Sequence, residues 1–483
     1  MYPPVDFASI GAMLQARFSQ EGFLSLSDLP HPSRFKDMNR ATERIVHAIR
    51  THQKIVLIGD YDVDGVVSTT LIKRFFEAID YPLEWIIPNR FRDGYGLSAN
   101  IVPRIVDFDL AITVDNGIAA VEAATLCAEH GIELIITDHH MLPKQLPQAY
   151  AIVNQKQSGC DFPYDEVCGA QIAWYLIASL NHALAAQVDT KSYIELLAIA
   201  IIADMMPLQH INRAMVTAGL KLLSRSSLPA IQAFRERLDK EDVNAEDIGF
   251  QMAPILNSAG RMDDASWSVE FLLSQNIYDA RVRLERLVGF NEQRKVIEQQ
   301  ITEEAMASVN PEDDVIVVQG ERWHEGVVGI VAARIGRRCE KPTIVLTRAE
   351  NGEFKGSGRS FSECNLFKIT HASKDLLSKF GGHHAAIGLS LPEANLEAFK
   401  QALQQSYRDE NYTADLVDPE ILGELPFSEI SFDLIALLKQ YEPYGQANSR
   451  PKFITTGVTI EDVSVMGKEG DHRRFLLSHQ GVL

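Results

Sequence analysis

Three aspartates at alternate positions are the residues of this sequence most suited to chemistry. Asp60, Asp62 and Asp64 closely follow the apolar run 55–58, which is long enough for a buried strand and ends at a glycine. Carboxylates this close repel one another, so such a cluster usually holds divalent cations or has shifted pKa values. A solvated acidic turn would contain the same residues, and the cluster alone does not separate the two interpretations.

Later apolar runs end in the same way. One is followed by Asp115, and the next by Asp138, His139 and His140. Helix-forming segments come after the runs, so the runs are predicted to be strands of a parallel sheet. The carboxyl ends of parallel strands lie at one edge, and ligands of open α/β sheets bind beyond that edge. The sequence therefore predicts that Asp62, Asp64, Asp115, His139 and His140 meet in one site.

A further carboxylate, Asp204, interrupts the apolar stretch 196–206, which is predicted to be a buried helix. An ionised carboxylate is costly to bury there without a partner. Carboxylates and imidazoles without cysteine suit hard or borderline ions. These residues therefore predict a Mn²⁺ or Mg²⁺ site.

The motifs around these residues resemble the DHH phosphoesterase superfamily in order and spacing. They are Asp-Tyr-Asp-Val-Asp-Gly from position 60, Asp-Asn-Gly from 115, Asp-His-His from 138 and Ile-Ala-Asp-Met-Met-Pro-Leu from 202. From about residue 35 onward the chain is similar to one branch, the bacterial RecJ-type single-strand-specific exonucleases. The resemblance implies an α/β protein with an N-terminal helical segment (1–50), a parallel-sheet DHH catalytic domain (51–265), a connector helix (266–312), a smaller α/β DHH-associated substrate-binding domain (313–412), a linker (413–450) and a partial OB-like C-terminal segment (451–483).

The resemblance also implies two bound ions, Mn²⁺ or Mg²⁺. Asp62 and Asp115 would hold the first ion, and the second would be held by Asp64, Asp115, His139 and Asp204. The implied catalytic residues are His140, which would contact the scissile phosphate, Asp115 and Asp138. Ile58 stands where the superfamily has a further histidine ligand. The ligand shell of the first ion is therefore expected to be more open or differently filled.

Arginines and glycine-containing segments are candidates for phosphate binding. A guanidinium can donate two parallel hydrogen bonds to phosphate, and glycines let a backbone approach it closely. Salt bridges on loops and ordinary turns would explain the same residues. The resemblance favours substrate contacts, and it implies them for Arg90, Arg92, Asn257, Arg261, His324, Ser357, Gly358, Arg359 and His383. Ile255 replaces an arginine that many members of the family carry.

The composition fits this interpretation without requiring it. The 483 residues suffice for several domains, and 46% hydrophobic content is ample for packed cores. Five cysteines without a Cys-x-x-Cys pair argue against a disulfide framework and a structural zinc site, and favour a reducing compartment. Residues 1–21 lack a signal-peptide pattern, and no uncharged apolar run reaches the about 18 residues of a membrane span. A soluble, cytoplasmic protein is expected.

A formal net charge of −19 argues against a nucleic-acid substrate, because phosphate binding normally needs a basic face. The charge is uneven, however. From Glu321 to Lys379 there are eleven Lys/Arg and seven Asp/Glu, a local net of +4. A basic lining within an acidic chain is compatible with DNA, although composition alone favours a small phosphorylated substrate.

The expected function is metal-dependent 5′→3′ hydrolysis of single-stranded DNA to mononucleotides, in DNA repair and recombination. A monomer without membrane contact is expected, with single-stranded DNA, a single-strand-binding protein and a repair helicase as partners. Two alternatives are a phosphodiesterase for cyclic dinucleotides or very short oligonucleotides, and a non-catalytic DNA-binding relative. The long connector argues against the first, and the retained metal ligands argue against the second.

Four expectations concern local structure. Residues 267–309 are predicted to form one long charged helix, and residues 257–261 a small-residue turn. The glycine segments 355–360 and 380–384 are either ordinary turns or, as the resemblance implies, parts of a substrate-binding wall. About thirty residues follow position 451, too few for a five-stranded OB barrel, so a degenerate or truncated version is expected.

Overall fold

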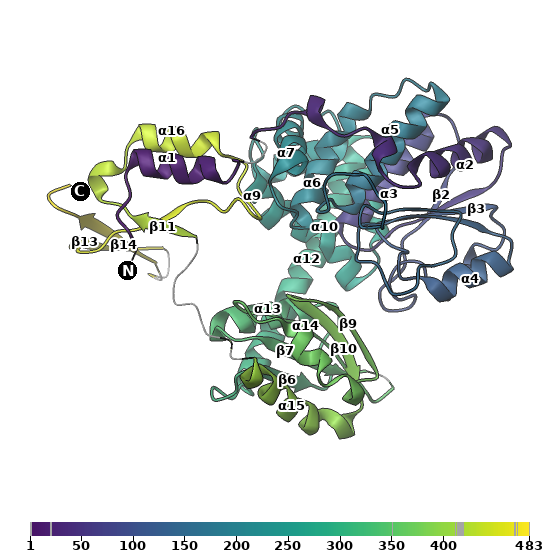
Figure 1. Cartoon of the computed structure of the whole chain (residues 1–483). Helices are drawn as coiled ribbons and strands as arrows, with labels where there is room; N and C mark the ends of the chain where they lie inside the picture. Colours follow the sequence, from purple (N-terminus) through teal and green to yellow (C-terminus); the bar gives the residue numbers. More distant parts are fainter. Residues whose placement is uncertain are drawn as a thin grey trace. The chain divides into compact units, whose positions relative to one another are not determined.

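The computed structural model of the chain contains two compact units. It describes residues 2–19, 22–349, 351–410, 412, 420–467, 470 and 472–482. Unit 1 comprises Met1–Asn257, Ala265–Leu284 and Asp418–Leu483, and unit 2 comprises Ser258–Asp264 and Glu285–Val417. Figure 1 traces the chain through both units by colour, and each unit is described by itself.

Five parallel strands form the main sheet of unit 1. Its order is β2-β1-β3-β4-β5, and every neighbouring pair is parallel. The strands are β1 (Ile55–Ile58), β2 (Glu84–Ile86), β3 (Leu110–Val114), β4 (Glu133–Thr137) and β5 (Ala151–Val153). The three apolar runs predicted as strands form its centre and are buried along almost all of their length. The predicted parallel sheet is thus confirmed, and its carboxyl ends lie at one edge.

Helices cover both faces of this sheet (Figure 1). Val56 and Ile58 point into a core shared with Ala123 and Cys127 of α4, whereas α3 packs against α5 and α6. The helices are α2 (Met38–Arg50), α3 (Val63–Ala78), α4 (Val121–Glu129), α5 (Gly169–Leu184), α6 (Ile194–Ala203), α7 (His210–Leu223), α8 (Pro229–Leu238), α9 (Ala245–Asp247), the π-helical turn Ile248–Met252, α10 (Ala253–Met262) and α11 (Ser266–Leu272). The predicted buried helix before Asp204 is confirmed as α6.

Residues 257–261 are helical, which corrects the predicted turn. They lie in α10, where Ser258 and Ala259 are fully buried. The Ser258 hydroxyl donates a hydrogen bond to the Leu287 carbonyl oxygen at 3.0 Å. Small residues that suggested a turn instead allow one helix to pack closely against another.

The connector helix is shorter than predicted. It is α12 (Ile277–Met306), and residues 273–276 separate it from α11. The Asn276 side chain accepts a hydrogen bond from Asp279 N at 3.0 Å and so caps the new helix. Because asparagine and its polar neighbours also occur on exposed helix faces, the pattern of polar residues did not reveal this break.

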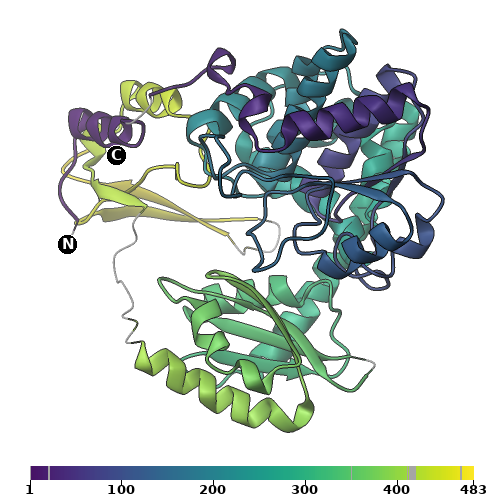
Figure 2. The same ribbon diagram turned by 45° about the vertical axis from the view of Figure 1, so that its right-hand side comes forward.

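Unit 2 is a five-stranded mixed sheet in the order β6-β7-β8-β10-β9. Only β6 and β7 are parallel to each other among its strand pairs in the described chain. Residues of α13 and the connector form the core on one face, and residues of α14 and α15 form the core on the other (Figure 2). The elements are β6 (Ile316–Gly320), α13 (Val328–Cys339), β7 (Thr343–Arg348), β8 (Phe354–Arg359), α14 (Leu366–His371), β9 (Lys379–His383), β10 (Ala386–Leu391) and α15 (Leu396–Asp409).

The two glycine segments of unit 2 are strands, so their interpretation as ordinary turns is wrong. They supply most of β8 and β9. A Cβ at Gly356 would lie 2.1 Å from the Val345 carbonyl oxygen, and one at Gly358 would lie 2.8 Å from side-chain atoms of Leu366 and Ile387. These glycines therefore allow close packing within the sheet and its core.

The range 413–450, predicted as a linker, contains folded elements. Residues 413–419 lie outside the described residues, but β11 (Ile421–Glu424) and α16 (Phe432–Gln440) follow them. Helix α16 shares a core with α1 (Phe7–Ala16), beside which it lies in Figure 1. The N-terminal segment is therefore divided between this core and α2. This pairing joins distant parts of the sequence, so local patterns could not predict it.

The C-terminal strands form two small sheets. β11 pairs in parallel with β12 (Lys452–Ile454), and β13 (Thr459–Met466) pairs with β14 (His472–Ser478) as an antiparallel hairpin. All five cysteines are free thiols. Among the described residues, no helix is both long and apolar enough to cross a membrane.

Gly219 in α7 should not tolerate alanine, although alanine has the higher helix propensity. An added Cβ would lie 2.6 Å from the Ile194 carbonyl oxygen and 2.4 Å from Ala198 Cβ, both in α6. Overpacking typically destabilises by about 1–3 kcal/mol, which exceeds the about 1 kcal/mol that alanine gains over glycine in a helix. Urea unfolding of Gly219→Ala should therefore show a lower free energy of unfolding.

Gly289→Ala in α12 is the matched control. No described heavy atom outside the immediate chain lies within 4 Å of an added Cβ at that position. This variant should be more stable by up to about 1 kcal/mol, because only helix propensity acts. A stabilised Gly219→Ala protein would contradict the close approach of α6 and α7.

Candidate active site

Asp62 and Asp64 lie at the junction between β1 and α3. Asp62 is the N-cap of α3, and its Oδ1 accepts hydrogen bonds from Asp64 N at 3.0 Å and Gly65 N at 3.1 Å. Asp64 lies in the first turn and is 2% exposed. The three aspartates are thus not on one extended segment, because the helix begins between them.

Asp64 is held by the start of a second helix. Its carboxylate accepts hydrogen bonds from Gly169 N at 2.6 Å and Ala170 N at 2.8 Å, the first two residues of α5. Amide groups at a helix N-terminus lack partners within the helix and favour a negative charge. The first turn of α5 therefore fixes the position and orientation of Asp64.

Asp115 follows β3 with a left-handed backbone, φ 62°, and is 1% exposed. His139 Nε2 lies 3.2 Å from Asp115 Oδ1, 3.8 Å from Asp64 Oδ2 and 3.7 Å from Asp204 Oδ2. The edge of the sheet thus gathers the acids and one imidazole predicted to meet there.

The carboxylates form two groups, each compact enough to hold one ion. Asp60, Asp62 and Asp115 form one group, and Asp64, His139 and Asp204 form the other, with candidate ligand atoms within 4.8 Å of one another. A third combination that meets the same distance, Asp115, His139 and His140, overlaps both regions of the site. Within the described chain, three buried oxygens of these residues have no hydrogen-bond partner: Asp60 Oδ1, Asp115 Oδ1 and Asp204 Oδ2. Buried carboxylate oxygens without partners are costly, so this donor set fits divalent cations.

Asp60 is a further metal-ligand candidate, which the sequence motifs did not assign to an ion. It belongs to the first aspartate motif but was not assigned to an ion, and it is 1% exposed. Its position directly after the glycine that ends the β1 run was the available signal. Ile58, at the missing histidine position, is fully buried in the core on the α4 face. Asp60 is therefore the residue that could fill the more open shell expected there.

The pKa values of the acids reflect their crowding. Burial first, and then the charge of Asp62, raise the pKa of Asp64 to about 6. Burial and the charge of Asp64 raise the pKa of Asp204 to about 9. The same two effects raise the pKa of Asp115 well above its usual range, and burial with Asp62 does so for Asp60. Without cations, protons must neutralise part of this cluster.

The two histidines differ in charge. Burial, followed by the charge of His140, lowers the pKa of His139 to about 3, so His139 is neutral at pH 7 and suited to bind a metal. Burial opposes a charge on His140 as well. The hydrogen bond and charge of Asp138, with the charges of Asp62 and Asp60, outweigh that effect and raise its pKa to about 9. His140 is therefore protonated at neutral pH.

Asp138 orients His140. One of its oxygens contacts His140 Nδ1 at 2.7 Å and accepts from His140 N at 3.0 Å, and the other accepts from Ile118 N at 2.9 Å. The Tyr95 hydroxyl lies 3.4 Å from the second ring nitrogen of His140. Asp138 thus acts through His140, and Tyr95 is a site neighbour that the sequence analysis did not identify.

Arg90 and Asn257 also belong to this region. The Arg90 guanidinium lies over the Tyr61 ring, 4.1 Å from its centroid, and its charge acts on Asp60. Asn257 Oδ1 accepts a hydrogen bond from Val63 N at 3.1 Å and so holds the first turn of α3. That structural role was not predicted. Arg92 lies exposed on the Arg90 loop.

In unit 2, Ser357 and Arg359 converge on the start of α13. Arg359 Nη1 donates to Ser357 Oγ at 2.7 Å. A Cβ on Gly329, near the start of α13, would lie 2.9 Å from Arg359 Nη2 and 3.2 Å from Ser357 Oγ. The N-cap residue of α13, Val327, provides no side-chain hydrogen bond. A guanidinium and a hydroxyl therefore lie beside a helix N-terminus, an arrangement that suits phosphate.

The other predicted residues of unit 2 occupy three environments. Arg261 Nη1 donates to the Gly326 carbonyl oxygen at 3.1 Å, and Gly326 N donates to His324 Nδ1 at 3.1 Å, which brings Arg261 and His324 to the loop before α13. His383 lies exposed at the end of β9. Gly358 is buried and faces the core around α14, on the opposite side of β8 from the side chains of Ser357 and Arg359. In unit 1, Ile255 is 7% exposed and lies in α10.

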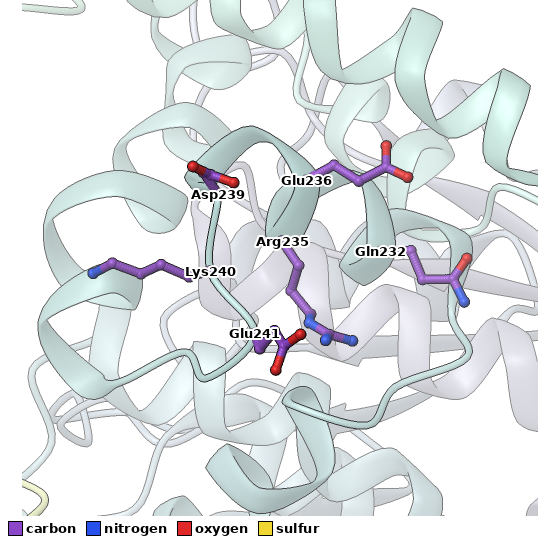
Figure 3. A pocket seen from close by; sticks show the side chains of 6 residues that line it. All are labelled: Gln232, Arg235, Glu236, Asp239, Lys240 and Glu241. Atoms are coloured by element: carbon purple, nitrogen blue, oxygen red, sulfur yellow. The ribbon is translucent and has the colours of Figure 1, made fainter.

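A surface hollow of about 350 Å³ lies elsewhere in unit 1. It is lined by Gln232, Arg235, Glu236, Asp239, Lys240 and Glu241 around the end of α8 (Figure 3). Glu236 pairs with Arg281 at 2.8 Å, and Lys240 pairs with Asp247 at 2.5 Å. Because opposite charges compensate there, the hollow is a weaker candidate site than the carboxylate cluster.

Sequence profiles of three domains match the chain in order. The DHH family N-terminal domain matches residues 54–201, the DHHA1 domain residues 312–409 and the RecJ OB domain residues 421–482. The third match begins within the predicted linker, where β11 begins. The predicted fold class, with DHH, DHH-associated and OB-like parts, is thereby supported.

Two curated relatives of the chain carry the same name. The chain is 33% identical to the single-stranded-DNA-specific exonuclease RecJ of Bacillus subtilis over 94% of its own length and 58% of that protein. It is 32% identical to RecJ of Salmonella typhimurium over 92% of its length and 83% of that protein. The chain thus spans somewhat more than half of one relative and most of the other.

A solved structure is similar across nearly the whole chain. The structure of RecJ from Thermus thermophilus in complex with Mn²⁺ has a TM-score of 0.81 and 26% identity, covering 98% of this chain and 72% of that one. Together with the ligand geometry and the profile matches, this confirms the family predicted from the four motifs. The chain belongs to the DHH phosphoesterase superfamily and, within it, to the RecJ family of exonucleases.

Proposed function

We propose that this chain is a metal-dependent exonuclease that hydrolyses single-stranded DNA from its 5′ end, releasing mononucleotides during DNA repair and recombination. The observation that carries this proposal is the pair of carboxylate groups sharing one sheet edge, with buried oxygens that lack other partners. Relatives named as single-stranded-DNA-specific exonucleases support the substrate class.

The proposed ligands follow the two groups in the site. Asp62 and Asp115, with Asp60 added by the structure, would hold one ion; the other would be held by Asp64, Asp115, His139 and Asp204. RecJ of Thermus thermophilus has been solved with Mn²⁺ and with Mg²⁺, which supports either cation here. Two divalent cations at such a site activate a water molecule and neutralise charge on a phosphodiester undergoing hydrolysis.

The protein's own groups have separate tasks. Protonated His140, held by Asp138, offers a positive hydrogen-bond donor for a non-bridging oxygen of the scissile phosphate. Neutral His139 presents Nε2 to the second group of acids. Asp115 is the residue proposed to bind both ions, because it belongs to one ligand group and also contacts His139 of the other.

The substrate's terminal phosphate is assigned to unit 2. Ser357, Arg359 and the start of α13 provide a hydroxyl, a guanidinium and backbone N–H groups, with Arg261 and His324 on the adjoining loop. Arg90 adds a further cation next to Asp60 in unit 1. A single-strand-binding protein and a repair helicase are the proposed partners, and the proposed state is a cytoplasmic monomer.

His139→Ala and His140→Ala should have different effects. His139→Ala should weaken Mn²⁺ binding, because a neutral imidazole of the second group is lost. His140→Ala should bind Mn²⁺ at least as well as wild type, because it removes a positive charge, while kcat falls roughly 10²–10³-fold. Calorimetric Mn²⁺ titrations and turnover on single-stranded DNA measure both effects. Equal loss of metal in the two variants would refute this division.

Mn²⁺ binding should release protons at pH 7. The pKa of Asp204, raised to about 9, keeps this group protonated in the metal-free protein, and a ligand carboxyl must lose its proton. Apparent affinity should therefore fall as the pH is lowered, by roughly tenfold per pH unit for each proton released. Titrations in two buffers of different ionisation enthalpy count these protons, and identical heats would show that none is released.

Arg359→Ala should remove a preference for 5′-phosphorylated strands. A terminal phosphate carries roughly one more negative charge than a diester, so wild type should degrade it faster than a 5′-hydroxyl strand. Initial rates on 3′-labelled strands, at one salt concentration, should show stepwise shortening from the 5′ end and a smaller preference in the variant. Mn²⁺ affinity should not change.

Arg408→Ala is the control for this comparison. Arg408 pairs with Asp314 at 2.7 Å on the surface of the same unit, away from the residues assigned to phosphate. It should retain the full preference. A wild-type protein that shortens strands only from the 3′ end would refute the proposed polarity, and an Arg359→Ala protein that keeps the preference would refute the phosphate assignment.

A further inference from the structure

Two buried side-chain amides connect the segments that carry the second group of acids. Gln171 of α5 is fully buried, and Asn212 of α7 is 3% exposed. Gln171 Nε2 donates a hydrogen bond to Asn212 Oδ1 at 2.9 Å. A buried amide pair is costly unless all its groups are bonded, so the other contacts of these two side chains matter.

Gln171 fixes the start of α5. Its Oε1 accepts a hydrogen bond from Cys168 N at 2.9 Å, the N-cap residue of the helix. The next two backbone amides, of Gly169 and Ala170, are the donors that hold Asp64. A change at Gln171 would therefore alter the helix turn on which the Asp64 carboxylate rests.

Asn212 fixes two backbone segments with one NH₂ group. Its Nδ2 donates to the Glu166 carbonyl oxygen at 2.8 Å and to the Pro207 carbonyl oxygen at 3.0 Å. Glu166 lies in the segment that leads into α5, and Pro207 lies in the loop that leaves Asp204. The two segments are thus held at a fixed separation by a single side chain.

Asp204 needs this support more than Asp64 does. Asp204 Oδ2 has no hydrogen-bond partner in the described part of the chain, so backbone position decides where it lies. Its helix has ended, and the next residue, Met205, is 67% exposed with φ 55°. Met205 N and Met206 N close the helix end by donating to Ile202 O and Ile201 O at 3.1 and 3.0 Å. The Pro207 carbonyl, bonded to Asn212, is the next fixed point of this loop, and Leu208 N bonded to Gln446 O at 2.8 Å follows it.

We propose that the Gln171–Asn212 amide pair positions Asp64 and Asp204 for the second metal ion. Both acids lie at nearly equal distances from His139 Nε2, 3.8 and 3.7 Å, and the pair connects the segments that set these distances. This inference rests on the ligands assigned under the proposed function. Asp60 and Asp62 lie on neither segment, whereas Asp115 is shared by both ions and lies against Gly169 at the start of α5. The first ion should therefore depend on the amide pair less than the second ion does.

Asn212→Ala tests the proposal through metal binding. Wild type should bind two Mn²⁺ ions per chain, counted by the loss of the free-Mn²⁺ electron paramagnetic resonance signal. The variant should bind one ion with nearly wild-type affinity and the other roughly ten- to hundred-fold more weakly, as expected when a group supporting metal ligands is lost. Gln171→Met, which lacks the amide but has a similar shape, should weaken the same ion.

Asn181→Ala is the matched control, because Asn181 makes a similar pair of amide hydrogen bonds near the other end of α5. Its side chain bonds to Val188 O and Val188 N, each at 2.9 Å. This variant should lose stability in urea but keep both ions at wild-type affinity. The comparison separates a general loss of packing from a loss of ligand position.

The outcomes separate the two proposals. Folded Asn212→Ala or Gln171→Met protein that binds both ions at wild-type affinity would overturn the positioning role, as would equal weakening of the two ions. If Asn212→Ala does not fold, the result for Gln171→Met decides. Wild-type protein that binds no Mn²⁺, or only one ion, would instead refute the ligand assignment on which the inference rests.

Discussion

The packing of several carboxylates into a buried edge of the sheet is the constraint on which this structure depends. Asp60, Asp64 and Asp115 are each no more than 2% exposed. Burial, followed by the charge of a neighbouring aspartate, raises the pKa of each of them. Such an arrangement opposes folding unless protons or cations neutralise it. The surrounding elements therefore supply helix N-termini and a neutral imidazole in place of water.

Helix N-termini hold two of the aspartates in the cluster. Asp62 caps α3, and Asp64 rests on the first amides of α5. In unit 2 the start of α13 lies beside Ser357 and Arg359, where a phosphate charge is proposed to bind. In each case backbone N–H groups that have no partner inside their helix are available to donate hydrogen bonds to a negatively charged group. Strand-to-helix connections thus supply much of the site's electrostatics.

The net charge of −19 is less of an obstacle to DNA binding than it first appears. Part of the acidity lies in the buried cluster, where it requires cations rather than repelling the substrate at the surface. Protonated His140 and Arg90 partly offset it in unit 1. The region from Glu321 to Lys379, with its local excess of positive charge, contains Ser357 and Arg359. For DNA binding, the positions of the charges therefore matter more than the net charge of the chain.

The sequence by itself determined the strands, the motif residues that meet at their ends and the family, because apolar runs and acids directly after them are local features. It did not reveal that Asn257 holds Val63 N, that Gln171 and Asn212 tie two segments together, or that α1 packs with α16. These contacts join residues far apart in the chain. Only tertiary packing decides which buried polar groups meet, because each must find a partner wherever folding places one.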